Sequence, residues 1–288
     1  MGNKRRKRRK KFKPSFLITV FLIFAISFGA IYYTFFENKA PKEVTSETVS
    51  SEISSQPEEV FEKPVLANLV NQKNPFGNPE AAKKIMYLTF DDGPSAKITP
   101  QILDALKKED IRATFFVLGT MARSNPEMLK RIYREGHEIA LHSDSHDYGK
   151  IYKSKEAFFA DFDMNEKAVM DITGFKPRIF RFPGGSNNNA FPVSLRKTIY
   201  EELKNRGYTY CDWNAGYEDA VGGTITVASI LNAAKKDYSS NNVIMLAHDA
   251  AAKQSSADAT GEIIQYFKNK GYDFDVLSKC SYFPQFAS

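Results

Sequence analysis

Two histidines separated by three residues give the first indication of chemistry in this 288-residue sequence. On one turn of helix-like backbone, His142 and His146 would lie on the same face and could bind one ion. Such a pair alone is more often structural, but Asp91 and Asp92 add the carboxylate that a metal site needs. Two histidines and one aspartate leave a coordination position open, which is typical of a catalytic metal site.

The two adjacent aspartates can serve different purposes, because successive side chains of a strand point to opposite sides. One carboxylate can bind the metal while its neighbour faces the open coordination position and acts as a base. Asp91-Asp92-Gly93-Pro94 could instead be a turn whose residues suit its backbone geometry. Beside the histidine pair, we favour the metal site.

Three further segments supply the other groups that a hydrolytic centre needs. Arg181 could orient the base and lower its pKa through a bidentate ion pair, and His248 could be the acid for the leaving group. The sequence Pro183-Gly184-Gly185 leaves the backbone unobstructed, so an N–H group there could face a developing oxyanion. Alternatively, Arg181 is a surface cation and His248 is a packed histidine at a strand end.

These residues follow segments that alternate between strand and helix patterns. Apolar runs of strand length occur at residues 85–90, 113–118, 138–141, 178–182, 208–214 and 242–246. Helical spacing of apolar residues occurs at 100–108, 126–135, 154–173, 195–206, 226–238 and 259–270. The alternation predicts an α/β fold with a mainly parallel sheet, either a barrel slightly short of eight repeats or an open doubly wound sheet. Active groups of such folds gather at the carboxyl ends of the strands, where the polar residues above are found.

The N-terminal region predicts a membrane anchor. Residues 1–14 carry nine positive charges, and residues 15–36 contain no charged side chain. As a helix, this second segment would extend about 33 Å, enough to cross a hydrocarbon core of about 30 Å. The positive-inside rule places the tail in the cytoplasm and the chain beyond residue 37 outside. A cleaved signal peptide is the alternative, but its apolar core would be shorter and would end in small residues.

Composition narrows the remaining possibilities. Residues 37–82 are rich in Ser, Thr, Glu and Pro, which predicts a disordered extracytoplasmic stalk before a catalytic domain at residues 83–288. Because the positive charge is concentrated in the tail, we expect no nucleic-acid partner. No Gly-rich phosphate-binding loop follows a predicted strand, which disfavours a nucleotide-binding sheet. Cys211 and Cys280 could form a disulfide outside the membrane or remain buried thiols.

Four motifs occur in order within the predicted catalytic domain at residues 83–288. They are Thr89-Phe90-Asp91-Asp92-Gly93-Pro94, His142-Ser143-x-x-His146, Arg181-Phe182-Pro183 and Leu246-Ala247-His248. Their order and spacing resemble those of the polysaccharide deacetylases of carbohydrate esterase family 4, the NodB-homology domain, over about residues 84–275. The resemblance implies an irregular (β/α) barrel of seven or eight repeats and a divalent metal, commonly zinc. It also implies hydrolysis of N-acetyl groups on β-1,4-linked N-acetylglucosamine polymers, or of O-acetyl groups on xylan.

The same resemblance implies a role for each motif residue. Asp91 resembles the catalytic base and His248 the catalytic acid, and Arg181 resembles the residue that orients the base. The metal ligands that it implies are Asp92, His142 and His146.

On the substrate side, the resemblance implies that Leu246 lines a small pocket for the acetate methyl group. The backbone N–H of Gly184, which follows Pro183 at the binding groove, would be an oxyanion donor. The third motif of the family often ends in Tyr where this chain has Gly184, so one wall of the groove is altered.

The family also has a motif with an Asp-Trp pair, which can be aligned with this chain in two ways. Its Asp-Trp pair matches either Asp212-Trp213 or Asp219-Ala220, so the carboxylate that tunes His248 is Asp219 or Asp212, with a slight preference for Asp219. Trp213, the only tryptophan, could be a sugar platform or a packed aromatic residue.

We therefore predict a single-pass cell-membrane protein with an extracytoplasmic, monomeric catalytic domain. Its expected activity is removal of acetyl groups from N-acetylglucosamine in a cell-wall polysaccharide, and peptidoglycan is the polymer that we expect. An O-acetyl esterase of the xylan type and a deacetylase of chitin or an exopolysaccharide are alternatives within the enzyme class. A wall-glycan-binding module without turnover is the alternative from another class.

Overall fold

The computed structural model describes residues 83–220 and 225–287. The predicted tail, membrane span and stalk at residues 1–82 lie outside these ranges. Within the described ranges, no helix is both long enough and apolar enough to cross a membrane.

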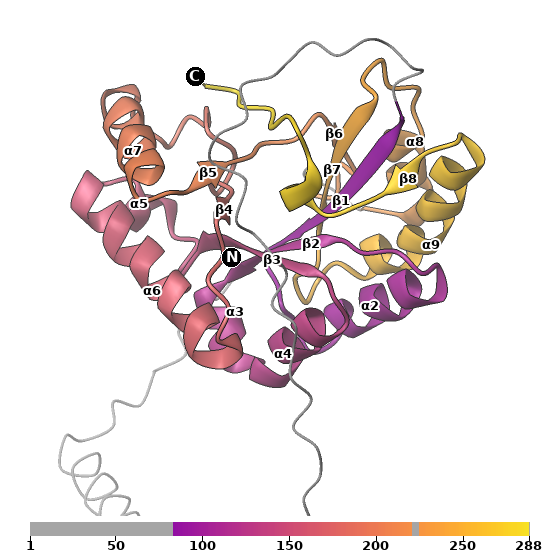
Figure 1. The fold of residues 1–288 in the computed structure, drawn as a ribbon, viewed down its shortest axis with the longest axis horizontal. Helices are drawn as coiled ribbons and strands as arrows, with labels where there is room; N and C mark the ends of the chain where they lie inside the picture. Colours follow the sequence, from indigo (N-terminus) through magenta and orange to yellow (C-terminus); the bar gives the residue numbers. More distant parts are fainter. Residues whose placement is uncertain (1–82, 221–224, 288) are drawn as a thin grey trace, which may run out of the picture. The chain divides into compact units, whose positions relative to one another are not determined.

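Eight parallel strands form one curled sheet, and helices pack around its outer side (Figure 1). The strands are β1 (Ile85–Asp91), β2 (Thr114–Leu118), β3 (Glu138–Ser143), β4 (Ile179–Phe180), β5 (Thr209–Tyr210), β6 (Ala215–Gly216), β7 (Asn242–His248) and β8 (Asp273–Phe274). Their order is β5-β4-β3-β2-β1-β7-β6, and β8 pairs with the first residues of β1. The prediction of an α/β fold around a parallel sheet is confirmed.

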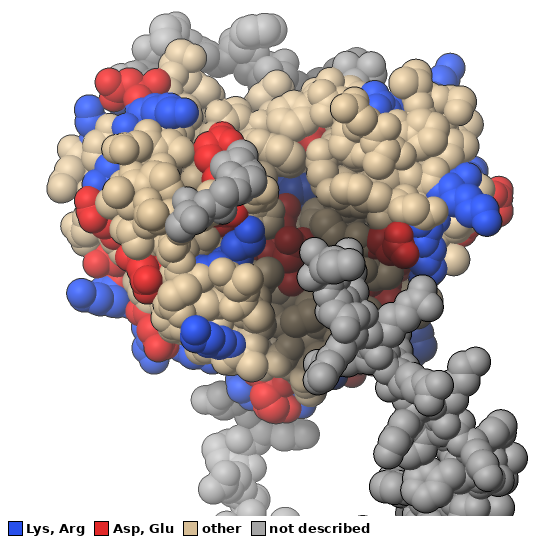
Figure 2. All heavy atoms as spheres, turned by 180° about the vertical axis from the view of Figure 1, so that it is seen from behind, with Lys and Arg blue, Asp and Glu red and all other residues tan. Residues whose placement is uncertain are grey.

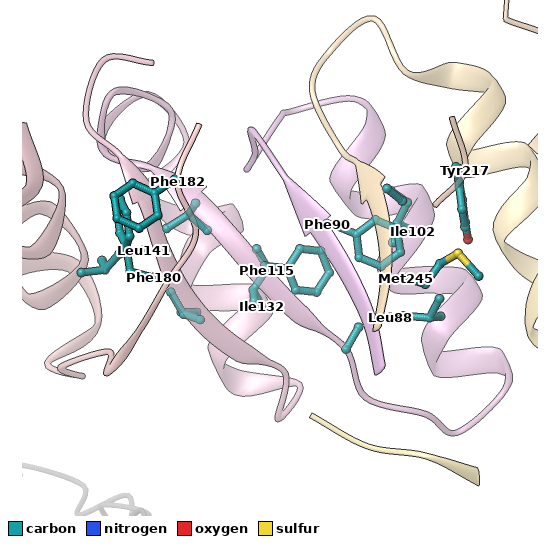
Figure 3. Close-up of a cluster of buried hydrophobic side chains, with 14 of the residues drawn as sticks. Leu88, Phe90, Ile102, Phe115, Ile132, Leu141, Phe180, Phe182, Tyr217 and Met245 are labelled. Atoms are coloured by element: carbon teal, nitrogen blue, oxygen red, sulfur yellow. The ribbon is translucent and has the colours of Figure 1, made fainter. Parts of the chain in front are cut away.

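The helices cover the sheet with apolar faces. They are α2 (Ile98–Lys108), α3 (Gly119–Ser124), α4 (Pro126–Arg134), α5 (Tyr148–Ile151), α6 (Lys155–Thr173), α7 (Val193–Asn205), α8 (Val227–Ala234) and α9 (Gln254–Asn269), with a 3-10 turn at Leu277–Lys279. Ile98 and Ile102 of α2 are buried at a spacing of four residues, as an amphipathic helix requires. In Figure 3, Ile102 of α2 and Ile132 of α4 belong to the same buried cluster as the strand residues Phe90 and Phe115.

The sheet is least regular between β4 and β6. The strands predicted at residues 178–182 and 208–214 are reduced to two residues each, and the short elements α3, α5, β6 and β8 were not predicted. Pro183 has no N–H to continue a strand ladder, and the side chain of Arg181 is fully buried. The chain therefore leaves the sheet here to build loops at the carboxyl end.

The two edges of the sheet are joined by the chain itself. β5 and β6 lie at opposite ends of the strand order, yet only residues 211–214 separate them. Arg181 contacts this junction, because its Nε donates to the carbonyl of Cys211 at 3.0 Å and its Nη2 to that of Asp212 at 3.1 Å. The sheet is thus curled into a half-barrel. This agrees with the predicted irregular barrel in its parallel strands and its curvature.

Side chains that point into the curl form an apolar cluster of their own. Tyr87, Phe116 and Ile244 come from β1, β2 and β7, and all three are buried. Their neighbours along the strands, such as Leu88 and Phe115, belong to the cluster between the sheet and the helices. The alternation follows from the two-residue period of a strand.

The C-terminal segment closes the amino end of the curl. The backbone N–H of Leu277 donates to Thr114 Oγ1 at 3.0 Å, and that of Ser278 donates to Glu138 Oε2 at 3.1 Å. Both acceptors belong to the first residue of their strand. Leu277 and Cys280 are buried within the inner cluster, so the end of the chain completes this part of the core.

The two cysteines are buried free thiols, which is one of the two alternatives that the sequence leaves open. Cys211 belongs to the inner cluster together with Cys280. Burial raises the pKa of the Cys211 thiol to about 12, so this group stays protonated at neutral pH. A protonated, enclosed thiol has a packing role here and no reactive one.

Candidate active site

Three predicted metal ligands lie together at the carboxyl end of the sheet. Nε2 of His142 is 3.5 Å and Nε2 of His146 is 3.4 Å from Asp92 Oδ1. The three ligand atoms all lie within 4.8 Å of one another. Asp92 Oδ1 is buried and has no hydrogen-bond partner among the described residues. A buried carboxylate oxygen that faces two imidazole nitrogens fits a divalent cation.

The two histidines do not share a helical turn as the sequence spacing suggested. His142 belongs to β3, and His146 lies in the loop before α5 with a φ of 56°. Asp92 has a φ of 75°, so two of the three ligands have left-handed backbone. The chain turns back sharply after each strand, which brings the ligand side chains together without a helix.

A backbone carbonyl fixes the tautomer of His142. Its Nδ1 lies 2.8 Å from the carbonyl oxygen of Arg181, which can only accept, so Nδ1 carries the proton. The lone pair of Nε2 is then free to face Asp92. Burial raises the pKa of Asp92, but the electrostatic attraction of the nearby His142 and His146 side chains lowers it more, so the pKa lies well below its usual range.

Asp91, the predicted base, pairs with a fully buried arginine. Arg181 Nη1 donates to Asp91 Oδ1 at 2.9 Å and to Thr89 Oγ1 at 2.7 Å. The predicted bidentate ion pair is wrong, because the other two donor nitrogens of Arg181 bind backbone carbonyls. The guanidinium also lies over the ring of Phe116, with Cζ 4.0 Å from the centroid. The alternative of a surface cation is excluded by this burial.

Asp219 contacts His248, and Asp212 does not. His248 Nδ1 lies 2.7 Å from Asp219 Oδ1, and the other oxygen of Asp219 accepts from the backbone N–H of His248 at 3.0 Å and from Ser256 Oγ at 2.6 Å. Burial lowers the pKa of His248, but the hydrogen bond and charge of Asp219 raise it more, so the pKa lies above its ordinary value. The strand register pairs His248 with Asp91, which places the two groups side by side on β7 and β1.

Comparison with known proteins identifies the family of this chain. The polysaccharide deacetylase family model matches residues 78–209. A crystal structure of the catalytic domain of a peptidoglycan N-acetylglucosamine deacetylase from Eubacterium rectale is 35% identical, and its TM-score is 0.67. That match covers 73% of this chain and 95% of the other. The chain belongs to the polysaccharide deacetylase family.

Relatives of this deacetylase differ in the activities that their names give. A peptidoglycan-N-acetylglucosamine deacetylase of Bacillus cereus is 29% identical over 279 residues, which is 93% of each chain. A bifunctional xylanase/deacetylase of Pseudobutyrivibrio xylanivorans is 31% identical over 219 residues, covering 74% of this chain and 33% of that protein. The predicted family resemblance is confirmed, and with it the prediction of a hydrolytic deacetylase.

In this deacetylase, Asp212 supports the turn that follows β4. Its Oδ1 accepts from the backbone N–H of Ser186 at 2.9 Å, and its Oδ2 accepts from Ser186 Oγ at 2.6 Å and from the N–H of Phe286 at 2.7 Å. Trp213 packs edge-to-face on Phe286, with 5.0 Å between ring centroids, and also against the inner apolar cluster. Of its two predicted roles, the packed aromatic residue is the one that these contacts describe.

The substrate-side residues of the prediction lie on two loops and one strand. Leu246 is half-buried in β7, two residues before His248 and therefore on the same side of the strand. The carbonyl of Pro183 accepts from Tyr152 Oη at 2.8 Å and from Asn188 Nδ2 at 3.0 Å. Gly184 has a φ of 75°, and its N–H has no acceptor among the described residues.

Asp161 of α6 holds the loop that carries the second histidine, and the sequence analysis did not identify it. Its Oδ2 accepts from Ser143 Oγ at 2.5 Å and from the N–H of Asp144 at 2.7 Å. Its Oδ1 accepts from the N–H and the Oγ of Ser145, at 3.0 and 2.6 Å. Ser143 Oγ in turn accepts from the N–H of His146 at 2.9 Å. An aspartate on the buried face of a helix was the available signal, since buried carboxylates need partners.

Asp249 is a second buried carboxylate beside the site. Its Oδ2 accepts from Thr99 Oγ1 at 2.6 Å, while its Oδ1 has no hydrogen-bond partner among the described residues. A Cβ on Gly93 would lie 2.0 Å from that Oδ2, so the glycine of the first motif leaves room for this carboxyl. Burial raises the pKa of Asp249, Thr99 lowers it, and the charges of Asp92 and Asp91 raise it again, to about 7.

The network around Asp161 predicts a loss of metal affinity in Asp161→Asn. The amide nitrogen cannot accept hydrogen bonds, so part of the loop loses its partners and His146 is less well positioned. We expect Zn²⁺ affinity, measured by competition with a chromophoric chelator, to fall about 10- to 100-fold. Asp163→Asn is the matched control, because Asp163 lies on the same helix and binds Arg206 at the surface. Equal affinities of the two variants would contradict the role of Asp161.

The raised pKa of Asp249 predicts a pH-dependent stability difference. The folded carboxyl has a pKa of about 7, against about 4 when unfolded, so the folded state binds the extra proton between these values. The contribution of Asp249 to the free energy of unfolding therefore falls as the pH rises from 4 to 7. In chelator, the melting temperature of Asp249→Asn relative to wild type should rise by about 5 °C between pH 5 and pH 8. A difference that does not change with pH would show that Asp249 does not titrate in this range.

Proposed function

We propose that this deacetylase removes acetyl groups from N-acetylglucosamine units of peptidoglycan in a metal-dependent reaction. The observation that carries the proposal is the pairing of Asp91 with His248 on adjacent strands, next to the cluster of Asp92, His142 and His146. A base, an acid and a three-ligand site are the groups that amide hydrolysis requires. The relatives from Eubacterium rectale and Bacillus cereus, whose names give this substrate, support the choice of polymer.

Asp92, His142 and His146 would hold the metal, and one carboxylate with two imidazoles suits zinc. When bound, the ion would polarise the acetyl carbonyl and lower the pKa of water. Asp91 is the proposed base: Arg181 holds its Oδ1, and its Oδ2 faces His142 with 3.9 Å between Oδ2 and Nε2. Oδ2 is therefore the oxygen that accepts a proton from the attacking water.

His248 is the proposed acid for the leaving amine. Asp219 binds its Nδ1, so Nε2 is the nitrogen that donates the proton. The raised pKa keeps a larger fraction of His248 protonated near neutral pH, and Asp219 stabilises the imidazolium. The N–H of Gly184, which has no acceptor among residues 83–220 and 225–287, is the proposed donor to the oxyanion. Leu246 is the proposed wall against the acetyl methyl group.

The location of the enzyme is also a proposal. An anchor at residues 15–36 with the basic tail in the cytoplasm would place the monomeric catalytic domain outside the cell membrane. The stalk at residues 37–82 could reach at most about 160 Å when extended. This reach suits a wall polymer as substrate. Removal of residues 1–36 should release the enzyme from the membrane fraction, and retention there would refute the anchor.

An ester substrate is the second candidate, because the xylanase/deacetylase relative shares this domain. The same groups can hydrolyse an acetyl ester or an acetamide. The products separate the candidates, since only the amide yields a free amine. Glycan binding without acetate release would instead indicate a binding module.

The proposed function predicts metal-dependent acetate release by the full chain in detergent. With N-acetylglucosamine tetramer and with intact peptidoglycan, we expect release that a chelator abolishes and Zn²⁺ restores. Amine assays on the products should detect one new amine for each acetate. Chelator-resistant release would contradict the metal, and release only from acetylated xylan would contradict the proposed substrate.

Two variants separate the base from the metal ligands. Asp91→Asn should lower kcat by about a hundredfold or more and still bind Zn²⁺, because only the proton acceptor is lost. His142→Ala should lose high-affinity Zn²⁺ binding as well as turnover, since one of three ligands is removed. Normal turnover by Asp91→Asn would refute its assignment as the base.

A further inference from the structure

Tyr148 is an aromatic residue at the metal site that has no role in the mechanism above. It begins α5, two residues after His146, and the two ring centroids are 5.3 Å apart. The side chain is partly open to solvent, with 38% of the residue exposed. Its hydroxyl has no hydrogen-bond partner among the described residues. A phenol in this position offers one unused donor beside the metal ligands.

The hydroxyl of Tyr148 occupies the space where a side chain at residue 184 would lie. A Cβ added to Gly184 would be 2.8 Å from Tyr148 Oη and 3.3 Å from its Cζ. Any other residue at position 184 would also strain the backbone, because the φ of Gly184 is 75°. The glycine therefore lets the ring of Tyr148 form the wall of the site next to the proposed oxyanion donor.

Neighbouring contacts fix the ring in this place. Tyr152, one turn later in the chain, has its ring centroid 5.9 Å from that of Tyr148, and its Oη donates to the carbonyl of Pro183. Asn188 Nδ2 binds the same carbonyl and that of Gly185 at 2.8 Å. The turn at 183–185 and the start of α5 are thus one connected unit. A ring packed between Tyr152 and His146 is preorganised for a ligand, which lowers the entropy lost on binding.

We infer that Tyr148 is a substrate-binding residue whose hydroxyl donates a hydrogen bond to an oxygen of the sugar unit that carries the acetyl group. The inference rests on the proposed function, and it adds the residue that positions the N-acetylated hexosamine against Gly184 and His146. An acetylated sugar suits this place because its hydroxyl and amide oxygens accept hydrogen bonds, while its C–H face can contact the exposed ring. The ring contact with His146 is separable from this role, because it needs no hydroxyl.

Tyr148→Phe tests the hydroxyl alone, since the ring remains. We expect KM for the N-acetylglucosamine tetramer to rise about 5- to 30-fold with kcat nearly unchanged, as loss of one binding contact predicts. Zn²⁺ affinity and melting temperature should stay at the wild-type values. Tyr282→Phe is the matched control: Tyr282 is 61% exposed in the C-terminal segment, so its loss of a hydroxyl should change none of these quantities.

An unchanged KM would overturn the inference, and so would a rise in KM that follows a loss of Zn²⁺ affinity. The binding constant of the tetramer should weaken by the same factor when Tyr148→Phe is added to Asp91→Asn, which removes turnover from the comparison. If wild type releases acetate only from another acetylated glycan, the proposed substrate fails, and the same comparison on that glycan still decides the role of Tyr148. If no acetylated glycan binds, both proposals fail.

Gly184→Ala provides an independent measure of the contact. In the wild-type background the new methyl group meets Tyr148 Oη and displaces the ring, so KM should rise. In Tyr148→Phe the obstructing oxygen is absent, and the same substitution should cost less. Fully additive effects of the two substitutions on KM would show that residues 148 and 184 do not act together.

Discussion

The buried guanidinium of Arg181 is the interaction on which the site and the fold both depend. It donates to Asp91 and Thr89 on β1 and to two carbonyls of the segment that joins β5 to β6. A fully buried cation is costly unless every donor has a partner. The same requirement that orients the proposed base therefore also holds the sheet edges together. Loss of this side chain would affect catalysis and the curl of the sheet at once.

Around Arg181, three buried carboxylates of the deacetylase form hydrogen bonds with a histidine or with a nearby loop. Asp219 binds His248, Asp161 binds the loop before His146, and Asp212 binds the turn after Gly184. Each carboxylate holds one loop at the carboxyl end of the sheet, where unpaired strand ends need partners. On the face drawn in Figure 2, basic and acidic side chains are interspersed, and acidic side chains lie within a hollow. The chemistry therefore comes from specific contacts and not from a bulk field.

The sequence predicts the parts of the site that depend on local order. His142 and His146 were identified because two adjacent aspartates occur in the same chain, and the order of the motifs then singled out Asp92 as the third ligand. The apolar periodicity identified the major strands and helices. The choice between Asp219 and Asp212 required the path of the chain after β5, which no local pattern contains. The helical spacing of the histidines was a wrong interpretation, because a left-handed residue in a loop achieves the same approach. Asp161 was missed because it binds serine and backbone groups 16 to 18 residues away. Tyr148 was missed because the glycine beside its hydroxyl lies far along the chain.

The position of the C-terminal segment has a consequence for how the domain is made. β8 pairs with β1, so Ile85 meets Asp273, and Leu277 completes the cluster inside the curl. Contacts between the first and last strands give the fold a high contact order, which slows folding. The inner core is complete only when residues 277–280, which are far from β1 in the sequence, have packed inside the curl.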